Sequence, residues 1–201
     1  PSLSGTFPKI YYESLARAFR EKQDFQRSKA WYERYMTIDS LNPRIAGNLA
    51  EVYGKTGDSA RAFDMLKQAA RLNTTDPDIY INLGVRLAER GDTSGAITEF
   101  QRALAIDSTS VLACADLSLL AMGRGDYSLA ARCASAAILH GMREPSLYRC
   151  AGISYFMTGE SGKAANYLDE YLKQVPSDMK IRDAVARIDS LARSRNHHSK
   201  Q

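Results

Sequence analysis

Apolar and small side chains return along this chain in two stripes, and the pair of stripes repeats every 34 residues. Within each unit they stand at positions 4, 7, 8 and 11, and again at positions 20, 24 and 27. Spacings of three and four residues place side chains on one face of an α-helix. Each unit is therefore predicted to hold two helices, separated by a turn.

The turn between the two stripes is a glycine followed by an acidic residue. It appears at Gly57, Gly91, Gly125 and Gly159, and one period earlier the pair reads Gln23-Asp24. Asparagine or aspartate before proline at two unit boundaries provides a helix N-cap followed by a favourable first residue. The pattern sets five units, with no insertion or deletion, at residues 9–42, 43–76, 77–110, 111–144 and 145–178.

Two positions of the unit are always small. Small residues there let the two helices of a unit approach closely, because a larger side chain would push the backbones apart. We therefore expect each unit to be an antiparallel helical hairpin. The eighth position holds Ala16, Ala50, Gly84, Ser118 and Gly152, and the twentieth holds Ser28, Ala62, Ala96, Ala130 and Ala164.

This pattern resembles the tetratricopeptide repeat family over residues 9–178. The small positions and the turn match well, whereas tryptophan is absent from position 4 and the proline of position 32 survives only as Pro176. The resemblance implies an all-α fold, a right-handed α-solenoid of five antiparallel helix-turn-helix hairpins. It also implies a protein-binding scaffold rather than an enzyme.

A further helix is predicted over residues 179–195, with Asp178 as its cap. Its apolar stripe faces one way and its basic residues the other, which suits a capping helix that covers the last hairpin. Residues 1–8 are predicted to be a linker and 196–201 a flexible tail. The stripe contains Ile181, Ala184, Val185, Ile188, Leu191 and Ala192, opposite Lys180, Arg182, Arg187 and Arg193.

Charge argues against nucleic acid as a partner. Residues 179–201 hold six Lys or Arg and two Asp, so their net charge of +4 equals that of the whole chain and the preceding body is neutral. A nucleic-acid binder carries basic residues along a face of its body. Hydrophobic residues at 44% and charged residues at 25% are typical of globular chains.

The sequence leaves more than one cellular compartment as an alternative. Cys114, Cys133 and Cys150 lack metal-binding spacing and are expected to be unpaired core residues, which favours the cytoplasm, while one disulfide plus one free thiol is the alternative. The chain opens on Pro1, so upstream residues are expected to have been removed or left out, with a signal peptide, a membrane anchor and further repeats as the alternatives for what preceded it. A membrane-tethered or periplasmic location through such an anchor remains an alternative.

The candidate binding surface is the concave side of the array, lined by first helices at positions 5, 9 and 12 and by the adjacent residues Asn48, Lys55 and Met157. Its N-terminal half is polar and its half in units 3 to 5 is apolar. The apolar set is either a groove for an extended or helical segment, which this chain itself could supply, or a thick core between adjacent first helices. The polar set is Glu13, Arg17, Arg20, Asn48, Glu51 and Lys55, and the second set is Ile81, Val85, Ala115, Leu119, Met122, Arg149, Ile153, Phe156 and Met157.

One specialisation of the family is not expected. Tetratricopeptide co-chaperones grip a C-terminal carboxylate with Lys, Asn, Asn, Lys and Arg at set positions of their first helices. The corresponding residues here are Glu13, Arg17, Asn48, Ile81 and Val85, and only Asn48 matches.

No group of residues suggests catalysis, a cofactor or a metal site. Arg90-Gly91-Asp92 spells an adhesion tripeptide but is the turn of its unit, and His197-His198 stands in the predicted tail. The favoured function is a protein-binding adaptor. The alternatives are an assembly or self-association module, and a recruitment domain of an enzyme or membrane protein encoded upstream.

Overall fold

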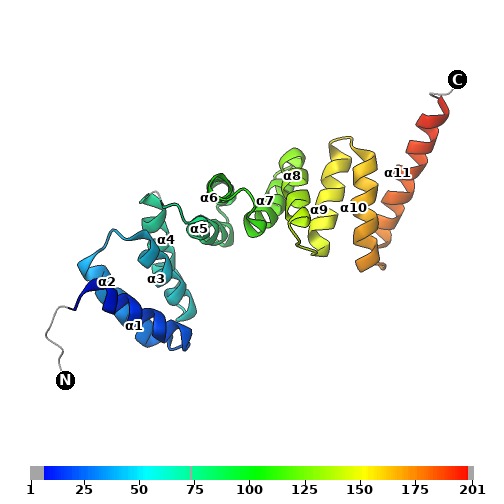
Figure 1. The fold of residues 1–201 in the computed structure, drawn as a ribbon. Helices are drawn as coiled ribbons and strands as arrows, with labels where there is room; N and C mark the ends of the chain where they lie inside the picture. The colour runs from blue at the N-terminus through cyan, green and yellow to red at the C-terminus, as the bar shows by residue number, and fades with distance from the viewer. Residues whose placement is uncertain (1–6, 73, 199–201) are drawn as a thin grey trace. The chain divides into compact units, whose positions relative to one another are not determined.

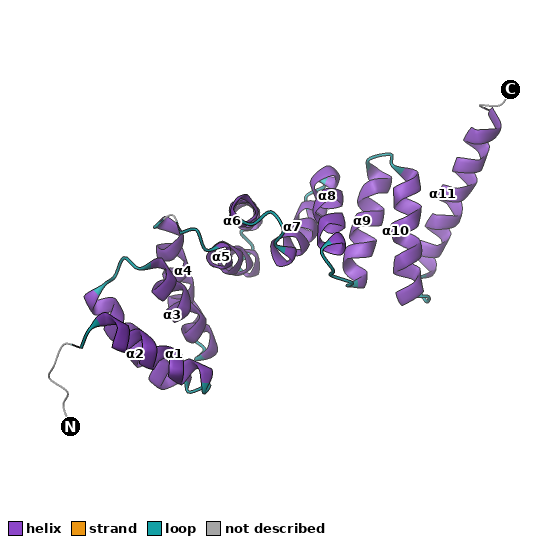
Figure 2. Cartoon of the chain, viewed as in Figure 1, coloured by secondary structure: helices purple, strands orange, loops and turns teal. Residues whose placement is uncertain are grey.

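The structure is a computed structural model that describes residues 7–72 and 74–198. In that part of the chain there are eleven helices and no strand (Figures 1 and 2). This confirms the all-α fold of helical hairpins. The helices are α1 (Lys9–Glu21), α2 (Phe25–Ile38), α3 (Pro43–Lys55), α4 (Ser59–Arg71), α5 (Pro77–Glu89), α6 (Thr93–Ile106), α7 (Val111–Gly123), α8 (Tyr127–Leu139), α9 (Pro145–Met157), α10 (Ser161–Gln174) and α11 (Met179–His198).

Local sequence signals explain where the helices begin. The first helix of each hairpin starts at the first residue of a 34-residue unit. Asn42 accepts a hydrogen bond from the amide of Ile45 before α3, and Asp58 accepts one from the amide of Arg61 before α4. These caps satisfy amides that have no partner within the helix.

The turn inside each hairpin needs a left-handed backbone. Four units place glycine there, for example Gly57 at φ 84° and Gly159 at φ 85°. The first unit places Gln23 at φ 59°, a conformation that a side chain makes unfavourable. The turn geometry is therefore kept even where the glycine is missing.

Close contact between the small positions holds each hairpin together. In the first hairpin the hydroxyl of Ser28 donates a hydrogen bond of 2.8 Å to the carbonyl oxygen of Ala16, and both residues are fully buried. In the fifth, a Cβ added to Gly152 would lie 2.5 Å from Cδ2 of Leu168. The second helix thus fills the space that a side chain would need.

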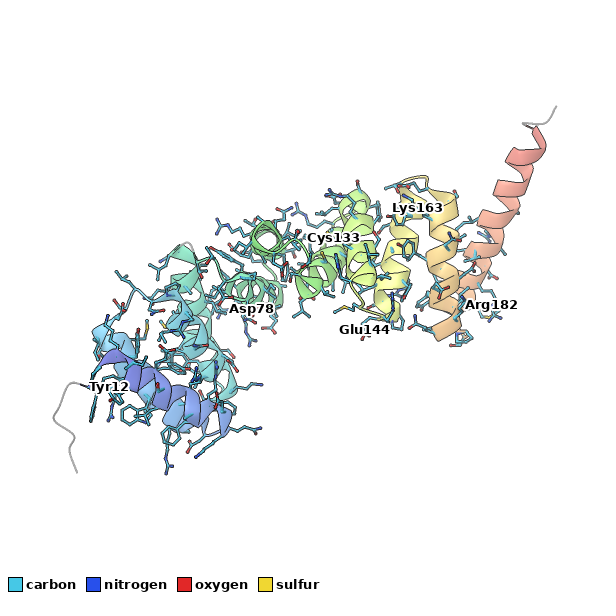
Figure 3. All side chains as sticks on the ribbon, in the orientation of Figure 1. Tyr12, Asp78, Cys133, Glu144, Lys163 and Arg182 are labelled. Carbon is cyan, nitrogen blue, oxygen red and sulfur yellow. The ribbon has the colours of Figure 1, made fainter. Side chains whose placement is uncertain are left out.

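The chain divides into two compact units, each larger than a 34-residue repeat: the first unit is Pro1–Ile106 and the second unit is Asp107–Gln201. In the first unit, three hairpins are joined by packing of α2 on α3 and of α4 on α5. Its aromatic core includes Tyr12, which Figure 3 labels on α1. The core consists of Tyr12, Ala16, Tyr32, Tyr35, Ile45, Leu49, Val52, Tyr53 and Ala62.

In the second unit, α8 packs on α9, α7 on α9, and α10 on α11. Val185 and Ile188 of α11 are buried against Ala164 and Leu168 of α10. The apolar stripe of the last helix therefore covers the last hairpin. The side chains of Leu191 and Ala192, predicted to extend this stripe, lie outside the described residues.

The last helix is longer than its sequence suggested. It continues to His198 rather than ending at residue 195, because Asn196, His197 and His198 include no proline or glycine to stop it. Residues 1–6 and 199–201, predicted to be parts of the linker and tail, lie outside the described residues. No described helix combines the length and apolar character needed to cross a membrane.

Candidate functional site

Most of the polar residues predicted to line the groove of the first unit form hydrogen bonds or ion pairs within the chain. The guanidinium of Arg44 donates to both carboxylate oxygens of Glu13 at 2.6 and 2.8 Å. Arg20 donates to the amide oxygen of Asn48 at 2.9 Å and to Glu51 at 2.8 Å. These bonds join α1 to α3, so these side chains have a structural role.

The other two polar residues differ. Arg17 lies 3.7 Å from Glu21 within α1, and both side chains are exposed. Lys55 lies at a polar cleft of about 250 Å³ formed by α3, α4 and α5. Asn82 and Arg86 of α5 line the same cleft, and neither was predicted from the sequence to line a binding surface.

The predicted apolar residues of α5 lie in the first unit. Ile81 is buried, with 7% of its surface exposed, and Val85 is half-buried. Ile81 therefore belongs to the packed interior, the alternative in which first helices share a thick core.

The seven remaining predicted residues lie on α7 and α9, which pack against each other in the second unit. Ala115 is buried at 8% exposure, whereas Met122 and Ile153 are half-buried. The exposed fractions of Leu119, Phe156 and Met157 are 41%, 45% and 54%. Arg149 is exposed as well. Three of the predicted apolar side chains in the second unit, those of Leu119, Phe156 and Met157, therefore stay accessible.

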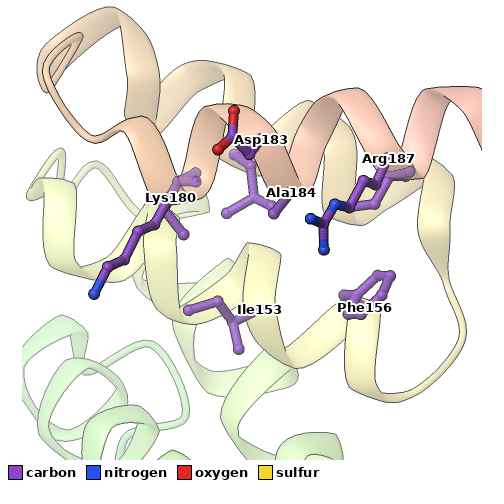
Figure 4. A pocket seen from close by; sticks show the side chains of 9 residues that line it. Ile153, Phe156, Lys180, Asp183, Ala184 and Arg187 are labelled. Atoms are coloured by element: carbon purple, nitrogen blue, oxygen red, sulfur yellow. The ribbon is translucent and has the colours of Figure 1, made fainter.

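Two of these residues open into a cleft of about 400 Å³ between α9, α10 and α11. Ile153 and Phe156 lie on the α9 side and face Ala184 and Arg187 of α11 (Figure 4). Leu168 of α10 also lines the cleft. This size lies within the range of ligand pockets in proteins, which hold mostly apolar walls and a few polar groups.

The charged residues at this cleft all belong to α11. Lys180 and Arg187 extend toward the α9 side in Figure 4, whereas the carboxylate of Asp183 points away from Ile153 and Phe156. Among the side chains that the structure describes, neither cation forms an ion pair. The mouth of an apolar cleft therefore carries two available positive charges.

Sequence reasoning missed the contribution of α11, although a signal was present. Met179 stands 34 residues after Pro145, so α11 occupies the place of the first helix of a sixth unit. Asp183 and Arg187 then hold positions 5 and 9, those used to define the groove elsewhere.

The three cysteines are buried free thiols. A hydrogen bond with Cys114 and burial raise the pKa of Cys133, and burial raises the pKa of Cys150. The Cys150 thiol lies 3.5 Å from the carbonyl oxygen of Ser118. Raised pKa values keep these two thiols protonated and poorly nucleophilic, so they act as small core residues.

Comparisons with known proteins agree with the helical hairpins. A family model described as tetratricopeptide repeat matches residues 48–111 and 116–178. No curated protein sequence matches the chain.

Solved structures with the same fold include a MamA protein, with a TM-score of 0.69 and 23% identity over 86% of this chain and 94% of that one. YrrB, described as a TPR protein with an unusual peptide-binding site, has a TM-score of 0.73 and 21% identity over 88% and 91% of the two chains. PilW, described as a type IV pilus biogenesis factor, has a TM-score of 0.61 and 20% identity over 98% and 93%.

Proposed function

Because the chain belongs to the tetratricopeptide repeat family, we propose that it is a non-enzymatic scaffold that binds a segment of a partner protein. The fold alone serves many processes, so the proposal rests on the surface of the second unit. Leu119 on α7 and Phe156 on α9 carry it, because each leaves more than two fifths of its surface exposed. The peptide-binding site described for YrrB supports this type of function.

The binding surface proposed here consists of Leu119 and Met122 on α7 together with Ile153, Phe156 and Met157 on α9. Large apolar side chains gathered on one surface are a common feature of protein-binding sites. Burying one such side chain contributes about 1.5–3 kcal/mol before the costs of association. A few of them suffice for micromolar binding.

A charge substitution tests this function. Leu119→Glu is expected to lower capture of a cross-linked native partner at least about tenfold, since it places a carboxylate where the partner packs. Leu139→Glu is the matched control, because Leu139 is 80% exposed but lies on α8, a second helix. Equal capture by the two variants, with unchanged thermal unfolding, would contradict the proposal.

A second candidate function is assembly, and one observation on α1 favours it. Tyr11 and Leu15, at positions 3 and 7 of the first 34-residue repeat, are 56% and 38% exposed. In the second, third and fifth repeats, where α2, α4 and α8 pack on the next first helix, the six residues at these positions are at most 4% exposed. They are Ile45, Ile79 and Leu147 at position 3, and Leu49, Leu83 and Ala151 at position 7.

The face of α1 is therefore suited to packing against another helix, and self-association is the form of assembly we propose for it. Light scattering at several concentrations tests this. Leu15→Glu is expected to shift a dimer to monomer. A strictly monomeric parent protein would remove this alternative and leave the peptide-binding proposal standing.

A further inference from the structure

Resting on the proposed function, we infer that the cleft between α9, α10 and α11 receives one large apolar side chain from an acidic segment of the partner. Family membership does not specify the chemistry of the ligand. Three features of the cleft do: its volume, its apolar walls and the sign of the charges at its mouth.

The volume follows from how α11 packs. α11 is in register with a first helix and packs on α10, yet a cleft of about 400 Å³ separates its Ala184 side from α9. A space of this size does not hold a helix, which is about 10–12 Å wide with its side chains. It suits one leucine, phenylalanine or similar side chain projecting from an extended segment.

The walls are apolar on all three helices. Ile153 and Phe156 come from α9, Leu168 from α10, and Ala184 from α11. Leu168 and Ile188, which both line the cleft, are only 2% and 4% exposed. The ligand side chain would therefore rest on a packed floor.

The charges select the flanking residues of the ligand. Lys180 and Arg187 reach toward the α9 side, and Asp183 points away from it (Figure 4). In the first unit, by contrast, the cations Arg20 and Arg44 already form ion pairs with Glu51 and Glu13. Carboxylates of a partner thus find available cations at this cleft, and a basic segment would be repelled.

Three labelled peptides test the inference on the full chain. The first carries one phenylalanine between two pairs of glutamates, the second replaces the phenylalanine by serine, and the third replaces the glutamates by lysines. Fluorescence polarisation should show binding of the first, with the serine peptide about ten- to a hundredfold weaker. The lysine peptide should bind still more weakly, and raising the salt concentration should weaken the first.

Isotope-labelled methyl groups locate the site. The first peptide is expected to shift the NMR signals of Ile153 and Ile181, which line the cleft, and to leave Ile79 in the first unit unmoved. Shifts confined to other methyl groups, or binding that is equal for all three peptides, would overturn the inference.

Two variants probe the walls and the charges. Ala184→Phe fills the cleft and should weaken the first peptide at least about tenfold, whereas Ala186→Phe, on an exposed position of the same helix, should not. Arg187→Glu changes only an exposed side chain and should also weaken binding of the first peptide. Arg132→Glu, at an exposed position of α8, is the control and should leave that binding unchanged. If Ala184→Phe impairs folding, the comparison of Arg187→Glu with Arg132→Glu still tests the inference.

The outcomes separate this inference from the proposed function. If Leu119→Glu abolishes capture of the native partner and Ala184→Phe and Arg187→Glu leave it intact, the cleft inference fails and the scaffold function stands. Failure of the first peptide to bind at millimolar concentration likewise overturns only the inference. If Leu119→Glu, Ala184→Phe and Arg187→Glu all leave partner capture unchanged, both fail.

Discussion

Glu13 and Arg44 join the first helices of two consecutive hairpins through two hydrogen bonds of 2.6 and 2.8 Å. The guanidinium lowers the pKa of Glu13 below its usual value of 4.5, chiefly through these hydrogen bonds. Glu13, predicted from the sequence to line the groove, thus joins α1 to α3 through Arg44.

The pair predicts a pH dependence of stability. A carboxylate with a lowered pKa stabilises the folded state above the pKa of the unfolded state, and this contribution is lost as the pH falls through the folded pKa. Glu13→Gln should therefore lower the melting temperature at pH 7 and lose its effect well below pH 4.5.

The size of this effect is limited by exposure, since the side chain of Arg44 is 55% exposed. We expect a loss of less than about 1 kcal/mol. Glu21→Gln is the control, because Glu21 is 69% exposed and its partner Arg17 lies 3.7 Å away. Equal melting curves for Glu13→Gln and the parent protein at pH 7 would show that the pair contributes nothing.

Gly152→Ala should destabilise the fifth hairpin. The new Cβ would lie 2.5 Å from Cδ2 of Leu168 and 3.2 Å from its backbone nitrogen, so α10 must move. Overpacking of this kind costs about 1–3 kcal/mol, measurable by urea unfolding. The control is Gly123→Ala at the end of α7, where no atom lies within 4 Å, and which should be neutral or stabilising.

Gln23→Gly should stabilise the first hairpin. Gln23 has a φ of 59°, while the other four 34-residue repeats have glycine at this position. Removing the side chain relieves an unfavourable conformation but adds freedom to the unfolded chain, so the net gain is at most about 1 kcal/mol. The reverse change, Gly57→Gln, should lower the melting temperature. A gain in both variants would refute the role assigned to backbone strain.

Asp116→Asn should raise stability at neutral pH. Burial raises the pKa of Asp116 above 3.8, because the half-buried position disfavours its charged form. The folded state therefore holds the proton more tightly, and stability is lost as the pH rises through the folded pKa. The advantage of the asparagine variant should vanish below about pH 3.8 in thermal scans. A variant that is less stable at pH 7 would indicate a favourable contact of the carboxylate.

The sequence was sufficient for the hairpins because their signals are local. Caps such as Asn42, turn glycines such as Gly57 and small residues such as Gly152 each act within one unit. Exposure could not be predicted in this way, because it depends on neighbours from other units. Ala115 and Leu119 both occupy predicted groove positions on α7, yet only Leu119 remains exposed.

Pairing across units was equally hidden. The bonds from Arg44 to Glu13 connect residues 31 apart in the sequence, and nothing in the spacing of either residue distinguishes them from solvated charges. The cleft beside α11 depends on how one helix packs against a hairpin, which the apolar stripe alone does not determine.

The register of α11 bears on how a further hairpin could be added to the array. α11 keeps the backbone position of a first helix, but at positions 4 and 11, where the fifth unit has Tyr148 and Tyr155, it carries Arg182 and Asp189. A second helix packed on α11 in the manner of the other hairpins would meet charged residues at positions where the fifth unit offers aromatic ones. Replacing Arg182 and Asp189 by tyrosine is therefore expected to make α11 a better first helix for a grafted hairpin.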